Sequence, residues 1–143
     1  MKFKILVILL LISSVVVNSQ ITTLSSPDQK ITVSLFNTGN TNVGEWYLKV
    51  SYSDNGKITE AIPRINIGLV REDQDFSKAL KFIKAGKPVL ITEQYSSLIG
   101  KKKQRNNSAN ESVISFENPD KTKLNLIIRA YNDGMVFRYE FPD

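Results

Sequence analysis

The side chains that could carry out acid–base chemistry in this chain are carboxylates, because its 143 residues include no histidine and no cysteine. This composition excludes Ser-His-Asp and Cys-His nucleophiles and zinc sites that contain histidine or cysteine. Paired carboxylates remain, as in glycoside hydrolysis, where one acid is protonated and the other is ionised. The candidates lie beside turns or strand-like runs: Glu93, Glu111, Glu117, Asp120, Asp133 and Glu140.

The sequence does not pair any two of these acids in space, and an acid beside a turn is more often a solvated surface group. We therefore assign no catalytic residue and no metal ligand to the chain. The glycines form no phosphate-binding loop either, since Gly39 and Gly44 do not stand between a strand and a helix.

The first 19 residues have the pattern of a secretory signal peptide. Lys2 and Lys4 precede a largely apolar run of 13 residues, and small residues precede a cleavage point after Ser19. The run is shorter than the roughly 20 residues that span a bilayer. Cleavage leaves 124 residues, which suit one domain, with 17 basic and 14 acidic side chains. We expect export to the periplasm or medium, no membrane span after cleavage and, at this modest charge, no nucleic-acid partner.

The rest of the chain has the pattern of short strands separated by turns. Apolar residues alternate with polar ones over 31–35 and 46–52, and Asn55-Gly56 predicts a hairpin turn into a strand at 57–62. Further strands are expected at 89–95, 112–116, 124–131 and 135–141, which are rich in β-branched and aromatic residues. This succession predicts an all-β protein with an antiparallel β-sandwich fold.

Two segments are less regular. Phe76, Leu80 and Ile83 have helical spacing after Asp75, which could cap a helix. One short helix and a bulged strand are therefore alternative predictions for residues 75–85. Residues 101–105 are basic and residues 106–110 are rich in asparagine, which predicts an exposed loop over 101–110.

Aromatic side chains could stack on sugars. We considered Trp46, Tyr47, Tyr52 and Tyr95. Trp46 and Tyr52 share a face with Leu48 and Val50, so we expect both to pack in the core. Tyr47 points to the other face and is a weak candidate for substrate binding.

The last strands form the most distinctive part of the sequence, RAYNDGMVFRYEF at 129–141. Asn132-Asp133-Gly134 predicts a three-residue hairpin loop with Gly134 in the left-handed region, which places Tyr131 opposite Met135 and Arg129 opposite Phe137. Both faces of the hairpin are mixed, which predicts a central hairpin covered on two sides. Buried arginines require acceptors, and Glu140 or Asp133 could serve Arg129 and Arg138.

This stretch resembles the characteristic hairpin of the N-terminal domain of glycoside hydrolase family 97. The matching positions are Arg129, Ala130, Tyr131, Asn132, Asp133, Gly134, Phe137, Arg138 and Tyr139. Earlier elements are similar in order, among them Ser26-Pro27-Asp28 and Glu93-Gln94-Tyr95.

The resemblance implies an exported α-glucosidase or α-galactosidase. Such enzymes have an N-terminal β-super-sandwich of the galactose-mutarotase-like type, which packs on a catalytic (β/α)8 barrel with a calcium ion at the active site. Residues 20–143 would then be the front part of the sandwich domain, incomplete at its C-terminal end, and the matching residues would be structural. Calcium, the oligosaccharide substrate and the catalytic barrel would belong to the longer enzyme, and strand edges left unpaired would favour association.

A free-standing exported β-sandwich that binds carbohydrate or another protein is the alternative. An enzyme complete within this chain ranks last, since it needs two of the carboxylates about 5–10 Å apart in a cleft.

Overall fold

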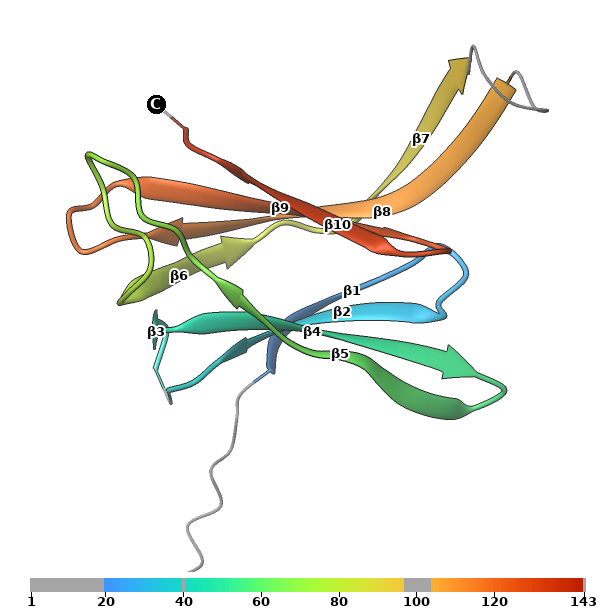
Figure 1. The fold of residues 1–143 in the computed structure, drawn as a ribbon, viewed down its shortest axis with the longest axis horizontal. Coiled ribbons are helices and arrows are strands. Elements are labelled where there is room, and N and C mark those ends of the chain that lie inside the picture. The colour runs from blue at the N-terminus through green and yellow to red at the C-terminus, as the bar shows by residue number, and fades with distance from the viewer. Residues whose placement is uncertain (1–19, 40, 97–103, 143) are drawn as a thin grey trace, which may run out of the picture.

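The computed structural model describes residues 20–39, 41–96 and 104–142. The predicted signal peptide lies outside these residues. The described chain is all-β, and it contains no helix (Figure 1). Its strands are β1 (Gln20–Ser25), β2 (Ile31–Asn37), β3 (Val43–Gly44), β4 (Trp46–Asp54), β5 (Lys57–Ile67), β6 (Leu80–Ala85), β7 (Val89–Ser96), β8 (Gln104–Glu117), β9 (Lys123–Tyr131) and β10 (Met135–Glu140).

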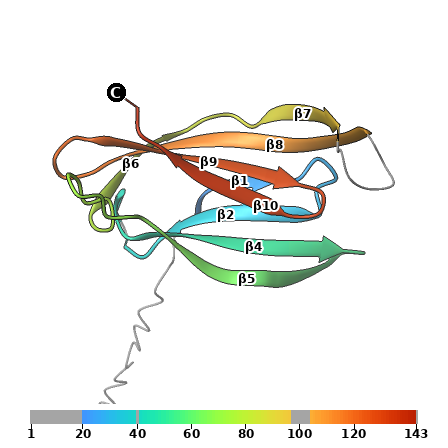
Figure 2. The ribbon, with the colours of Figure 1, turned by 45° about the horizontal axis from the view of Figure 1, so that its top comes forward.

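Two antiparallel sheets face each other, as the turned view in Figure 2 shows. The first sheet has the order β1-β2-β4-β5, and the second has the order β10-β9-β8-β6-β3, with β7 paired to β8. The predicted antiparallel β-sandwich is therefore confirmed.

The core lies between the sheets and follows the alternation in the sequence. From the first sheet it takes side chains such as Val33, Leu35 and Leu48, and from the second sheet Phe116, Leu126 and Ile128, all nearly or fully buried. Trp46 is buried as predicted, and its indole N–H donates to the carbonyl oxygen of Leu80 at 2.8 Å. This bond satisfies the one polar atom of the ring and joins the two sheets.

The turn between β4 and β5 has the predicted chemistry. Asp54 pairs with Lys57, and the two residues between them, Asn55 and Gly56, have φ values of 49° and 81°. Positive φ at both positions matches a type I′ hairpin turn, which suits the twist of the flanking strands.

Residues 75–85 form no helix, so the bulged-strand alternative was the right one. Leu80–Ala85 is strand β6, and its pairing with β8 shifts register between Phe82 and Lys84. Asp75 accepts hydrogen bonds from the backbone N–H and the hydroxyl of Ser77 in a local turn. The helical spacing misled because Phe76 and Leu80 reach the core from a loop and a strand, while Ile83 is exposed.

Two further expectations, one for the loop at 101–110 and one for Tyr52, were wrong. Residues 104–110 are not a loop but form the first half of β8. This half pairs with β7, from Gln104 opposite Ser96 to Glu111 opposite Val89. Residues 101–103 lie outside the described part of the chain. The loop was predicted from the polar side chains of this stretch, whereas its backbone N–H and C=O groups are satisfied by pairing with β7. Tyr52, which was expected to pack in the core, is 39% exposed and pairs with Thr59 close to the β4–β5 turn.

The register of the terminal hairpin differs from the prediction by one residue. Ala130, not Tyr131, lies opposite Met135, and Tyr131 N–H donates to Gly134 O at 2.8 Å across a four-residue connection. Gly134 does not adopt a positive φ. The observed register places Phe137 opposite Ile128, so that Phe137 and Tyr139 join the core side of the sheet. A shift of one residue would turn that apolar face to solvent, which explains why the hairpin adopts the observed register.

The hairpin is also not central. Among the strands that the structure describes, β10 is the edge of the second sheet, and β9 lies between β8 and β10.

Within the described residues, no helix is long and apolar enough to cross a membrane.

Gly68 allows the chain to turn from β5 towards β6. Its φ is +136°, and a Cβ atom at this position would lie 2.7 Å from the carbonyl oxygen of Phe76. We expect Gly68→Ala to lower the free energy of unfolding by more than about 1 kcal/mol, because both the backbone and the neighbouring chain would have to shift. Urea unfolding would measure the change.

Gly134→Ala is the matched control. Gly134 has no positive φ, and a methyl group added to it would meet no atom within 4 Å, so the change should stay within about 0.5 kcal/mol. Equal losses in the two variants would contradict this account of Gly68.

Candidate functional site

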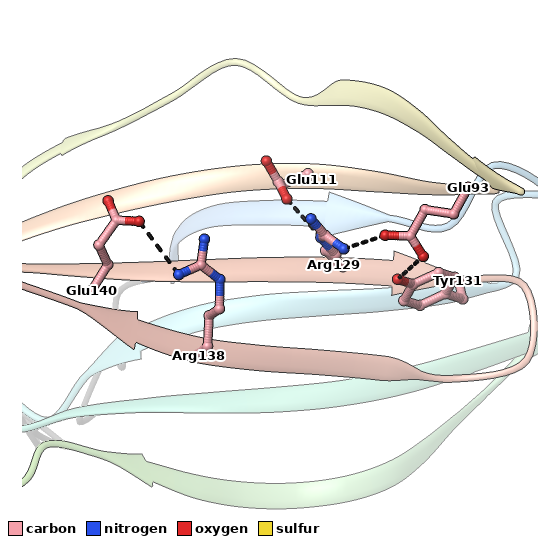
Figure 3. A network of polar contacts seen from close by, with 6 residues as sticks. All are labelled: Glu93, Glu111, Arg129, Tyr131, Arg138 and Glu140. Carbon is pink, nitrogen blue, oxygen red and sulfur yellow. Dashed lines mark hydrogen bonds and ion pairs between the residues drawn. The ribbon is translucent and has the colours of Figure 1, made fainter. Parts of the chain in front are cut away.

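The outer face of the second sheet carries an ion-pair network centred on Arg129 (Figure 3). Arg129 Nε donates to Glu111 Oε2 at 2.6 Å, and Nη1 donates to Glu93 Oε1 at 2.6 Å. The Tyr131 hydroxyl is 3.4 Å from Glu93 Oε2. The network therefore joins three neighbouring strands, since Glu93 lies on β7, Glu111 on β8, and Arg129 and Tyr131 on β9.

Strand register creates this arrangement. Glu111 pairs directly with Arg129 across β8 and β9, and such partners have side chains close together on one face of the sheet. The hydrogen bond that Arg129 donates to Glu111 raises the pKa of Arg129 above its ordinary value, and Tyr131 adds to this effect. The Arg129 side chain is about 30% exposed, so solvent screens the network only in part.

The other motif residues mostly serve the core and the hairpin ends. Ala130 is fully buried between the sheets, and Phe137 and Tyr139 pack against the core. The Tyr139 hydroxyl accepts a hydrogen bond from Gly68 N–H at 3.0 Å. This contact fixes the end of β5 beneath the edge strand β10.

Asn132 connects two stretches that are far apart in the sequence. Its side-chain oxygen accepts a hydrogen bond from the backbone N–H of Asp28 at 3.1 Å. The Asp28 carboxylate in turn accepts bonds from the Ser26 hydroxyl and from Lys30 N–H, which lower the pKa of Asp28. The Ser-Pro-Asp turn and the terminal hairpin loop, both noted in the sequence, therefore lie in contact.

The structure corrects the predicted partners of Arg129. Neither Glu140 nor Asp133 contacts it, and Glu140 instead lies 3.4 Å from Arg138 on the same strand. The Arg138 side chain is 60% exposed, so it is not a buried arginine. Sequence reasoning included Glu93 and Glu111 among the acids but missed them as partners of Arg129, because no local signal reports which strands become neighbours.

The remaining acids stay apart. Glu117 forms a weak ion pair with Lys121 at 3.4 Å, while Asp120 and Asp133 are exposed in turns. Among the residues that the structure describes, no group of three or more acids could hold a metal ion.

Tyr47 is 4% exposed, and both faces of its ring are covered. Phe36 stacks on it at 5.4 Å, and the guanidinium carbon of Arg64 lies 4.3 Å from the ring centre. A sugar could stack on Tyr47 only after Arg64 moved away, so its role in substrate binding stays a prediction.

A shallow hollow lies over the hairpin, lined by Ile127, Arg129, Val136, Phe137 and Arg138. Its volume of about 120 Å³ is below the roughly 300–1,000 Å³ of common ligand pockets. The geometry of the motif is therefore that of a structural brace.

A known family shares this sequence from the first strand to the terminal hairpin. The sequence model of the family described as Glycosyl-hydrolase 97 N-terminal matches residues 24–143. The chain belongs to this family. The match includes all of the motif at the terminal hairpin and the Ser-Pro-Asp turn that it contacts.

Individual relatives agree with the assignment. A protein of Streptomyces bingchenggensis (strain BCW-1) named "Probable retaining alpha-galactosidase" is 26% identical over 76 residues, which are 53% of this chain and 12% of the relative. Two solved structures of a family 97 enzyme from Pseudoalteromonas sp. strain K8, with acarbose and with panose, match with TM-scores of 0.68 and 0.65. They are 20% and 21% identical to this chain and show the fold alone. Each match covers 85% of this chain and 17% of the solved chain.

The family assignment relates the Arg129 network and the terminal hairpin to one known domain. In this glycosyl-hydrolase 97 N-terminal domain, the conspicuous motif residues fix β7, β8, β9 and the Ser-Pro-Asp turn relative to one another. The chain spans about one eighth of the curated relative and about one sixth of the solved structures that it matches.

We expect Arg129→Gln to lower the free energy of unfolding by about 1–2 kcal/mol, because Glu93 and Glu111 would lose the cation between them in a partly exposed site. The free energy of unfolding of Arg129→Lys should lie between those of Arg129→Gln and the parent protein, since an ammonium group does not reproduce the planar guanidinium that binds both acids. Chemical denaturation at neutral pH would measure both values.

Lys121→Gln is the matched control, because it also removes the cation of an ion pair but at a side chain that is 77% exposed. It should change the free energy of unfolding by less than about 0.5 kcal/mol. If Arg129→Gln were as harmless as this control, the network would not brace the sheet.

Proposed function

We propose that this chain is the non-catalytic sandwich portion of an exported α-glycosidase, and that it supports a catalytic (β/α)8 barrel formed by residues outside residues 1–143. The observation that carries the proposal is the family match over residues 24–143. The substrate would be an α-galactoside or α-glucoside. The name of the curated relative supports the first, and the acarbose and panose complexes of the Pseudoalteromonas enzyme support the second.

The state of the carboxylates supports a non-catalytic role. Glycoside hydrolysis needs one acid free to donate a proton and a second acid free to act on the sugar or on water. Glu93 and Glu111 are bound to the same guanidinium, and Glu140 is paired with Arg138. The candidates that sequence analysis named are thus engaged with cations or separated in turns.

We also propose that the calcium ion implied by the family resemblance belongs to residues outside this chain. The described acids form no group that fits a calcium site, since Ca²⁺ takes six to eight oxygen ligands. A free-standing binding module is not favoured, because the family match points to one domain of a glycoside hydrolase.

Hydrolysis assays would test the division of labour. With 4-nitrophenyl α-galactoside or 4-nitrophenyl α-glucoside as the substrate, the chain alone should release 4-nitrophenol no faster than buffer does. Any activity would be followed in Glu93→Gln and Glu111→Gln variants, and activity that disappeared in them would overturn the proposal. Sequencing the source DNA beyond the codon for Asp143 would test the barrel directly: an open frame with acids at successive strand ends is expected, and a stop codon would contradict it.

Export is a separate proposal, supported by the signal-like pattern of residues 1–19. In the native host, mass spectrometry of the extracytoplasmic fraction should find a protein that begins at Gln20. A protein that retained residues 1–19 in the cytoplasm would contradict export.

A further inference from the structure

The turn between β4 and β5 contains a pair of residues that can react with each other. Asn55-Gly56 is the one place in the sequence where glycine follows asparagine. Both residues are exposed, and the turn lies at one end of the first sheet (Figure 1). The Cγ atom of an asparagine amide is an electrophile that the backbone nitrogen of the next residue can attack. Glycine at that next position places no side chain in the way of the attack.

The structure leaves both reacting groups of this pair free. Among the described residues, the Asn55 side chain has no hydrogen-bond partner, and the Gly56 N–H has none either. The residues on either side, Asp54 and Lys57, pair with each other and close the hairpin, as a two-residue type I′ turn requires. A Cβ atom added to Gly56 would meet no atom within 4 Å, so the surroundings do not restrict the turn.

Other asparagines lack this combination. Every other asparagine of the sequence is followed by a residue that carries a side chain. Asn37 and Asn118 are also buried, and each donates and accepts hydrogen bonds through its side chain. The Asn110 amide donates to the carbonyl oxygen of Ser25, and Asn132 accepts a bond from the backbone. Reactivity should therefore concentrate at the β4–β5 turn.

We propose that Asn55 is a site of spontaneous deamidation in this protein, with water as the co-reactant. The Gly56 backbone nitrogen loses its proton and bonds to Asn55 Cγ, while the side-chain nitrogen takes up a proton and leaves as ammonia. This step closes a succinimide ring. Water then opens the ring at either of its carbonyl carbons. Opening at Cγ gives aspartate, and opening at the backbone carbonyl carbon gives isoaspartate, in which the main chain runs through Cγ.

The two products differ in their effect on the hairpin. Aspartate keeps the backbone of the turn, and it tolerates the left-handed region that Asn55 occupies at a φ of 49°. Isoaspartate adds a methylene group to the main chain between Asp54 and Lys57, where the type I′ turn joins the strands with two residues. We expect isoaspartate to disturb the pairs next to the turn, Asp54–Lys57 and Ser53–Ile58.

Peptide mapping of the folded protein tests the proposal, which does not rest on the proposed function. The protein is incubated at mildly alkaline pH, digested with trypsin and analysed by mass spectrometry. The peptide of residues 50–57 contains no other side-chain amide, and it should be the first to gain the mass of an amide-to-acid conversion. The rate should rise with pH, because the attacking nitrogen must lose its proton. An isoaspartate-specific methyltransferase should label the same peptide.

Asn55→Gln is the matched control, because it keeps the amide but would have to close a larger ring. Its peptide 50–57 should keep its mass while that of the parent protein is converted. Circular dichroism after incubation would confirm that both proteins are still folded. A parent peptide of constant mass, earlier reaction at another asparagine, or conversion of Asn55→Gln at the parent's rate would overturn the proposed site.

Urea unfolding tests the effect on the hairpin. Asn55→Asp supplies the aspartate product, and its unfolding midpoint should stay close to that of the parent protein. The isoaspartyl form, separated by ion exchange from incubated protein, should unfold at a lower urea concentration. Equal midpoints for the aspartyl and isoaspartyl forms would contradict the proposed disturbance of the turn.

Discussion

The structure depends on the burial of one face of β9 between the two sheets. Leu124, Leu126, Ile128 and Ala130 are almost completely buried there, and β9 has a strand on each side. Because side chains alternate along a strand, burying this face sends Asn125, Arg129 and Tyr131 to the other. The same constraint sets the register of β10, whose Phe137 and Tyr139 must lie on the core side.

The Arg129 network follows from this geometry. Once Arg129 projects from the outer face, its nearest cross-strand neighbour is Glu111, and Glu93 on the next strand is within reach of the other side of the guanidinium. An arginine with two acidic partners holds three strands in one arrangement, which suits a domain without disulfides. The family motif is thus explained by mutual support of strands, with no part in chemistry assigned to it.

The two ends of the hairpin are fixed by different means. At its loop, Asn132 accepts a bond from the Ser-Pro-Asp turn, and at its end Tyr139 accepts one from Gly68. Phe141 adds a contact with Phe76, with Arg71 over its ring. These contacts hold both ends of the hairpin against the rest of the domain.

Local sequence determined the strand pattern, the β4–β5 turn and the all-β sandwich, because alternation and turn chemistry are properties of neighbouring residues. The motif at residues 129–141 also sufficed to suggest the family. Only the tertiary structure decided that residues 75–85 form no helix, that Tyr47 lies beneath Arg64 and that Glu93 and Glu111 hold Arg129. It also shifted the register of the terminal hairpin by one residue. Each of these outcomes depends on which strands become neighbours and which faces they bury, and this is settled by contacts between residues far apart in the chain.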